Sequence, residues 1–203
     1  MLGRHMVYPA LAAVAVAMLR GERLDEILPR LAALPPALDR LIPRPLANGA
    51  VLLCDGRKSA LETIHAALDV FAEIPAARKI VVLGPINEPV GSPYPQYRAL
   101  GARIARIAQA AVFVDSYGKY KSGVRQAGMP LDACFDAGNG ISGAVEFLRR
   151  ELRRGDVALI KGRRSQKLER IALALEGRLV RCRLIACQVQ GTHCDYCPLL
   201  EKN

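Results

Sequence analysis

Short apolar runs that alternate with helical patterns are the feature that most restricts how this chain can fold. Lys79 to Gly84 (KIVVLG), Ala111 to Asp115 (AVFVD) and Asp156 to Gly162 (DVALIKG) are such runs, and segments of helical periodicity separate them. Strands that are buried on both faces have this continuous apolar pattern, and the helices between them form right-handed crossovers. The pattern therefore predicts an α/β fold in which a mostly parallel sheet carries flanking helices.

Other segments complete the predicted order of elements. We expect further strands at 51–55 and 131–136, a helix that ends near 71, and helices at 8–20, 24–31, 94–110, 119–127, 141–153 and 166–175. Asn48-Gly49 lies between two apolar runs and predicts a β-hairpin. A proline-rich break near residue 36 divides a helical pair at 1–40 from the α/β domain at 41–176. An extra strand and a cysteine-rich segment follow at 177–203, which we name the C-terminal tail.

Residues 9–19 (PALAAVAVAML) are the candidate for a targeting or membrane segment. This run is about half of the roughly 20 apolar residues that a spanning helix needs. Arg20, Glu22 and Arg23 follow it, where a signal peptide would have small residues and a cleavage site. We therefore expect a buried helix, no membrane span and a cytoplasmic protein. Its six cysteines are then expected to be free thiols or metal ligands rather than disulfides.

The formal net charge is +10, and arginines are concentrated between residues 149 and 183. A basic surface of this kind suits a polyanionic partner such as a nucleotide, a UDP-sugar or RNA. The same arginines can instead serve solubility on exposed helix faces. They also lack the interleaved aromatic residues that stack on bases. Both interpretations stay open at the level of sequence.

Four segments, in this order, resemble the Mur ligase family. Residues 3–21 (GRHMVYPALAAVAVAMLRG) are similar to its GRHNVxNxLAA junction between the central and C-terminal domains. Residues 44–55 (RPLANGAVLLCD) are similar to the hairpin that opens its C-terminal domain. Lys79 to Gly84 resembles the family's KIAVLGDM strand, and residues 147–169 resemble its FLxxxLxxGDVVLVKGSRxMxLE segment. The similarity extends over roughly residues 2–176, and it is greatest to the members that add D-alanyl-D-alanine.

The resemblance implies a Rossmann-like C-terminal domain, with residues 1–40 corresponding to the end of the ATP-binding central domain. In the family, ATP phosphorylates a substrate carboxylate, and an incoming amine attacks the acyl phosphate to give an amide and ADP. Catalysis there depends on Mg²⁺, a P-loop and positioned cations. Asp55, Lys161 and Arg164 match family motifs and are expected to bind nucleotide or substrate.

Several positions depart from the family pattern. No G-x-x-x-x-G-K-[ST] sequence occurs, so ATP and Mg²⁺ would require a partner that carries the P-loop domain. Met6 and Pro9 replace the two asparagines of the junction motif. Residues 57–61 (RKSAL) replace a Tyr-Asn-Ala-Asn-Pro turn that helps to hold nucleotide and substrate, and Pro85 stands where an acid is usual. We therefore expect no ligase activity from this chain alone, and we assign no catalytic residue.

The C-terminal tail carries a candidate metal site. Cys194-x-x-Cys197 can place two thiolates on one Zn²⁺, with Cys187 as a third ligand and His193 as a fourth. Cys182 is an alternative fourth ligand, although along a strand Cys182 and Cys187 would point to opposite faces. The competing interpretation is that these cysteines are free thiols, some of them in a core.

Two functions fit these observations. In the first, the chain is a non-catalytic Mur ligase C-terminal-like domain, a pseudoenzyme that acts as a binding or structural subunit of a larger assembly. In the second, it is the C-terminal part of a split or fragmentary ATP-dependent, ADP-forming amide-bond ligase of peptidoglycan synthesis. The altered motifs, the charge and the added tail favour the first function. The extent of the match and the retained Asp55, Lys161 and Arg164 favour the second.

Overall fold

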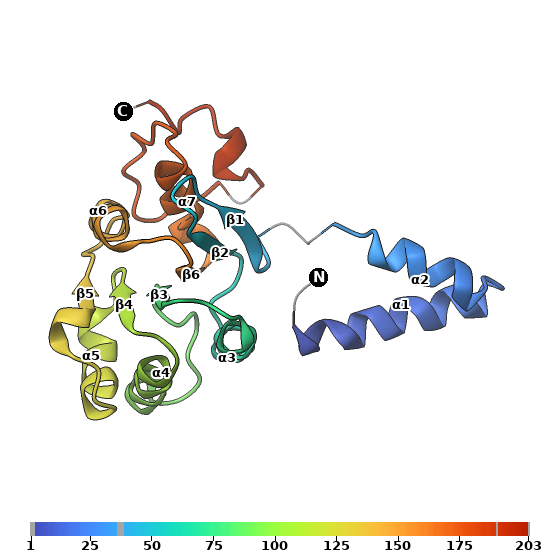
Figure 1. Cartoon of the computed structure of the whole chain (residues 1–203), viewed down its shortest axis with the longest axis horizontal. Coiled ribbons are helices and arrows are strands. Elements are labelled where there is room, and N and C mark those ends of the chain that lie inside the picture. Colours follow the sequence, from blue (N-terminus) through green and yellow to red (C-terminus); the bar gives the residue numbers. More distant parts are fainter. Residues whose placement is uncertain (1–2, 36–38, 190, 203) are drawn as a thin grey trace.

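Six strands form one sheet in the computed structural model, which describes residues 3–35, 39–189 and 191–202 (Figure 1). The strand order is β1-β2-β6-β3-β4-β5. The strands are β1 (Ile42–Pro45), β2 (Val51–Asp55), β3 (Lys79–Leu83), β4 (Ala110–Phe113), β5 (Cys134–Asp136) and β6 (Val157–Lys161). All neighbouring pairs are parallel except β1 with β2. The predicted α/β fold with a mostly parallel sheet is confirmed.

A tight turn joins β1 to β2, as the Asn48-Gly49 pattern predicts. The Oδ1 atom of Asn48 accepts a hydrogen bond from the amide of Ala50 at 3.0 Å. Gly49 has a φ of 83°, a left-handed conformation that costs least for glycine. The turn fixes the register of the hairpin and places Ile42 opposite Cys54.

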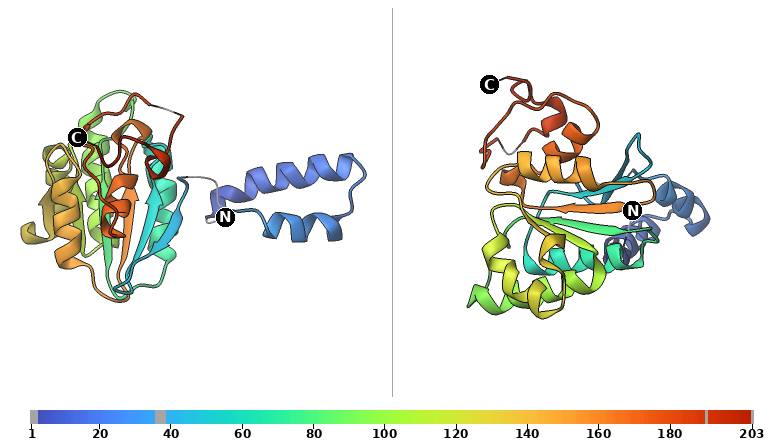
Figure 2. Two further views of the ribbon diagram at one scale, coloured as in Figure 1. Left: turned by 90° about the horizontal axis from the view of Figure 1, so that it is seen from above. Right: turned by 60° about the vertical axis from the view of Figure 1, so that its left-hand side comes forward.

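Helices cover both faces of the sheet (Figure 2). They are α3 (Leu61–Glu73), α4 (Pro93–Ile107) and α5 (Tyr117–Gln126) on one face, and α6 (Ser142–Glu151) and α7 (Glu169–Leu175) on the other. Side chains alternate along β3, so Val81 packs with the first group of helices and Val82 with the second. The two faces therefore form two apolar layers, and the sheet between them sets the positions of the residues at its ends.

Two helices precede the sheet, α1 (Val7–Leu19) and α2 (Leu24–Ala32), and they project away from it as a hairpin (Figure 1). The predicted buried helix is wrong for this chain, because α1 buries none of its residues. Its apolar side chains point in all directions, and α2 packs along one side of it. Among the described residues, no helix is both long and apolar enough to cross a bilayer.

The C-terminal tail lacks the strand that its sequence predicts, since residues 178–189 have no regular secondary structure. Its backbone forms single hydrogen bonds to carbonyl groups rather than a ladder with a neighbouring strand. The amides of Arg181 and Cys182 both donate to the carbonyl of Leu200, at 2.9 and 3.0 Å. Leu200 is buried against Leu173 of α7 and Cys194. The tail is therefore held by side-chain packing and by hydrogen bonds to its own last residues. An alternating sequence pattern does not predict contacts of this kind.

Candidate functional site

The carboxyl ends of β2 and β6 place Asp55 and Lys161 side by side. The two strands are parallel neighbours, and their register pairs Asp55 directly with Lys161. The Nζ atom of Lys161 lies 2.9 Å from Oδ2 of Asp55, and the two side chains are 0% and 6% exposed. Ligands of open α/β sheets often bind at this edge. The sheet thus brings together two of the three residues that the motifs selected.

The Lys161 ammonium and the Asp55 carboxylate neutralise each other's charge. Lys161 also donates a hydrogen bond to the carbonyl of Lys58, so its ammonium points into the protein. Burial lowers the pKa of Lys161, and the Asp55 carboxylate opposes that shift. The other carboxylate oxygen of Asp55, Oδ1, is buried and has no hydrogen-bond partner among the described residues. The site therefore retains one acceptor that a ligand, a water or a metal-bound water could use.

Arg164 lies in the loop that follows β6, as the first residue of a short 3₁₀ helix (Arg164–Gln166). In the described part of the chain, the Nε atoms of Arg163 and Arg164 are buried without hydrogen-bond partners. Unsatisfied guanidinium donors at a strand end are suited to an anionic group such as a phosphate or a carboxylate. These two Nε atoms and Asp55 Oδ1 are buried polar groups with unused bonding capacity among the described residues.

Two residues around the site have structural contacts. Ser59 donates its hydroxyl hydrogen to the carbonyl of Pro85 at 2.9 Å, which ties the loop after β2 to the loop after β3. The side chain of Gln166 crosses Gly84 so closely that a Cβ there would lie 2.3 Å from Gln166 Oε1. A larger residue at position 84 would therefore displace the Gln166 side chain from its packing against this loop. Both contacts fix the loops in place, and the first engages the Ser59 hydroxyl.

The residues of the predicted zinc site are distributed over the C-terminal tail. His193 and Cys194 are buried, while Cys187 and Cys197 are half-buried, and all six cysteines of the chain are free thiols. Within residues 3–35, 39–189 and 191–202, no group of three or more His, Cys, Asp or Glu side chains is gathered as metal ligands. Burial, together with Glu169, raises the pKa of the Cys194 thiol. The zinc site stays a prediction.

His193 takes part in a cluster that the sequence does not reveal. Its Nε2 atom lies 2.7 Å from Oδ1 of Asp39, and its Nδ1 atom lies 2.7 Å from Oδ2 of Asp195. A doubly protonated imidazolium donates to both carboxylates. The neutral ring can instead accept from the Asp195 amide, which lies 3.2 Å from Nδ1. The hydrogen bond to Asp39 is the main cause of the raised pKa of His193, against burial, with further help from Glu169 and Asp195.

This cluster makes stability depend on pH. A histidine whose folded-state pKa is raised stabilises fully below its ordinary value, 6.5, and loses that contribution as pH rises through the folded-state pKa. We therefore expect the free energy of unfolding, measured with urea, to fall as pH rises above about 6.5. Asp39→Asn should remove most of this slope. Asp132→Asn, which changes an exposed acid elsewhere, should leave it unchanged. Equal slopes for the wild type and Asp39→Asn would contradict this assignment.

Arg170 is a second feature that sequence patterns miss. It is 2% exposed, and its guanidinium donates to the carbonyls of Gln166 and Lys167 in the preceding turn, at 3.0 and 3.1 Å. It also donates to the carbonyls of Cys182 and Leu184 in the tail, at 2.9 and 2.7 Å. One side chain of α7 thereby holds the tail against the domain. The residue belongs to an arginine-rich stretch in the sequence, and no local pattern marks it as buried.

Comparison with known proteins gives similarity to one group of enzymes. No protein-family model matches the chain. The chain is 31% identical over 176 residues to UDP-N-acetylmuramoyl-tripeptide–D-alanyl-D-alanine ligase of Escherichia coli (strain K12). The aligned region covers 86% of this chain and 37% of that enzyme. A crystal structure of MurF from Acinetobacter baumannii has a TM-score of 0.74 and 22% identity, covering 87% of this chain and 38% of that one. MurF ligase from Thermotoga maritima in complex with ADP has a TM-score of 0.66 and 20% identity, over 81% and 36% of the two chains.

Proposed function

Since this chain is homologous to the C-terminal part of a Mur ligase and has the same α/β fold, we propose that it acts as a non-catalytic subunit that binds a protein partner. It spans only 37% of the curated relative, so the activity of a whole ligase is not carried over. The observation that carries the proposal is the exposed apolar surface of α1.

Helix α1 has the composition of a buried helix without the burial. Leu11 and Val16 are 60% and 62% exposed, and Tyr8 and Leu19 are more exposed still. Helix α2 covers one side of α1 and buries Ile27. Many exposed apolar side chains on one projecting element typically mark a protein interaction site. The helical hairpin is therefore proposed as the contact with the partner.

The strand-end site supports a non-catalytic role. Lys161 is directed inward to Asp55 and to the Lys58 carbonyl, and Ser59 is bound to Pro85. Arg57 and Lys58 are exposed in the loop where the family has its Asn-Pro turn. The residues that remain at this edge thus contact one another more than they face an incoming substrate.

One observation favours the alternative function, a split ligase whose partner carries the P-loop. Asp55 Oδ1 and the Nε atoms of Arg163 and Arg164 are buried without partners in the described residues. A nucleotide or a phosphorylated substrate could satisfy them when the partner closes over the site. In this alternative, ATP and Mg²⁺ come with the partner, and Asp55 and Arg164 contribute to binding.

The two functions separate in one experiment. We expect the tagged chain to capture a defined partner from its host, with nuclease treatment as the control for nucleic acid. Leu11→Glu should abolish that capture, whereas Leu131→Glu, which alters a leucine of similar exposure outside the hairpin, should retain it. Capture that is equal in both variants would refute the hairpin as the contact.

The purified complex then decides between the alternatives. A non-catalytic subunit predicts no ADP release when ATP, a UDP-muramoyl peptide and D-alanyl-D-alanine are added. ADP release that Arg164→Ala abolishes would replace the proposal with the split ligase.

A further inference from the structure

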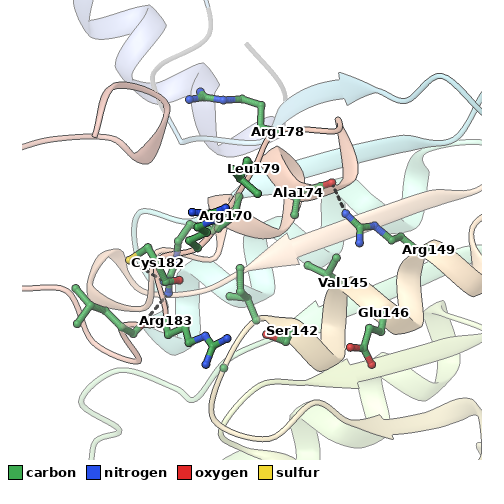
Figure 3. A pocket seen from close by; sticks show the side chains of 15 residues that line it. Ser142, Val145, Glu146, Arg149, Arg170, Ala174, Arg178, Leu179, Cys182 and Arg183 are labelled. Carbon is green, nitrogen blue, oxygen red and sulfur yellow. Dashed lines mark hydrogen bonds between the residues drawn. The ribbon is translucent and has the colours of Figure 1, made fainter. Parts of the chain in front are cut away.

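A cavity of about 480 Å³ lies between α6, α7 and residues 178–184 of the C-terminal tail (Figure 3). Part of its wall is apolar and comes from Val145, Ala174 and Leu179. Small-molecule sites in proteins typically have volumes of about 300–1,000 Å³ and combine apolar walls with a few polar groups. The C-terminal tail forms one wall of this cavity, which does not include the Asp55–Lys161 edge of the sheet.

The lining of the cavity is strongly basic. In the part of the chain that the structure describes, five arginines line it, against the single carboxylate of Glu146; they are Arg149, Arg170, Arg178, Arg181 and Arg183. Among the described residues, only Arg178 of these five forms ion pairs, with Asp195 and Glu201. Like charges gathered around a concave surface raise the local potential and attract a counter-ion. The cavity therefore has the electrostatics of an anion site.

Arg170 strengthens this conclusion, because its buried charge lacks a carboxylate partner. All of its oxygen acceptors are backbone carbonyls, from α7 and from the tail. A buried cation that only dipoles satisfy is costly relative to one that an anion neutralises. An anion within the cavity would offset that cost without displacing any of these bonds.

Two further arginines are free to contact such an anion. Arg149 projects from α6 toward α7 and uses one Nη atom to bind the carbonyl of Ala174 at 2.9 Å (Figure 3). Arg183 is exposed on the opposite, tail side of the cavity. Guanidinium groups from two sides can each make two parallel hydrogen bonds to phosphate oxygens.

We propose that this cavity binds a small molecule that carries a phosphate or pyrophosphate group. The volume of the cavity and its apolar wall favour a small phosphorylated ligand over a nucleic-acid strand, because strand-binding grooves typically carry aromatic side chains for stacking. None of the described residues that line the cavity is aromatic. The site goes beyond the proposed function and does not depend on it, since the residues involved lie far from α1 in the fold (Figure 1).

Calorimetric titration of the full chain with pyrophosphate and with ADP tests the proposal. We expect saturable binding of pyrophosphate to one site at low salt. The double substitution Arg149→Gln and Arg183→Gln should weaken binding by roughly 100-fold, about tenfold for each charge-assisted contact. The double substitution Arg106→Gln and Arg154→Gln removes the same charge from exposed positions elsewhere and should change the affinity less than twofold. Circular dichroism of all variants verifies folding.

Three results would overturn the proposal. The first is no saturable binding of pyrophosphate or ADP by the wild type. The second is an equal loss of affinity in the two double variants, because binding would then reflect general surface charge. The third is a single-stranded oligonucleotide that binds more tightly than ADP and that pyrophosphate cannot displace, since the surface would then be a nucleic-acid interface.

Discussion

Replacing Asp55 by alanine should lower the free energy of unfolding by about 3–5 kcal/mol, because it leaves the ammonium of Lys161 buried without its carboxylate. Among the described residues, the Lys58 carbonyl would then be the one remaining hydrogen-bond acceptor of Lys161. Desolvation then favours the neutral amine, so the pKa of Lys161 should fall further below its ordinary value than burial already lowers it. The difference in free energy of unfolding between the wild type and Asp55→Ala should therefore shrink as pH rises toward the ordinary pKa of lysine.

Urea unfolding followed by circular dichroism measures this effect. Adding Lys161→Met to Asp55→Ala removes the unpaired charge, and we expect most of the lost stability to return, as replacement of buried ion pairs by apolar residues is often neutral. Asp25→Ala breaks the exposed pair of Arg23 and Asp25 and serves as the matched control, with no measurable change expected. A loss in Asp55→Ala no greater than in Asp25→Ala would mean that the buried pair does not stabilise the domain.

The sequence predicts this pair only in part. Asp55 and Lys161 each follow an apolar run, which places both at the carboxyl edge of a parallel sheet. Their contact depends on β2 and β6 being neighbours in register, although they are separated by the whole α3 to α6 region. The resemblance to known ligases selected both residues, but neither it nor local periodicity predicted their contact. Arg164 was selected by the same motif, and the adjacent Arg163, with an equally unsatisfied Nε, was not.

The core elements were predictable because burial imposes a period on them. The apolar runs became β3, β4 and β6 within a residue or two of the expected bounds, and Asn48-Gly49 set the hairpin. Outside the core, no such period operates. The alternating residues of the C-terminal tail predicted a strand. In the described residues, however, the tail pairs with neither edge strand of the sheet, β1 or β5. The contact of His193 with Asp39 joins residues 154 positions apart, for which composition gives no signal.

Replacing Arg170 by leucine should release the C-terminal tail and lower the free energy of unfolding by about 3–4 kcal/mol, because buried carbonyls lose a charged donor. Two of these carbonyls, at Cys182 and Leu184, lie in the tail, so the loss of structure should be concentrated in the tail. We expect faster amide hydrogen exchange at Arg181 and Cys182, whose amides bind Leu200, and faster tryptic cleavage after Arg181 and Arg183. Arg106→Leu, at an exposed position on α4, is the control.

The same experiment separates two ways of ordering the tail. If Arg170 and the His193 cluster hold it, Arg170→Leu loosens the tail and a zinc chelator leaves exchange in the wild type unchanged. If Cys187, His193, Cys194 and Cys197 bind zinc, the chelator itself loosens the wild-type tail. Unchanged exchange in Arg170→Leu would contradict the anchoring role of the buried guanidinium. A matched variant, Arg170→Lys, keeps the charge but lacks the planar fork that reaches both helix and tail carbonyls, so it should restore only part of the protection.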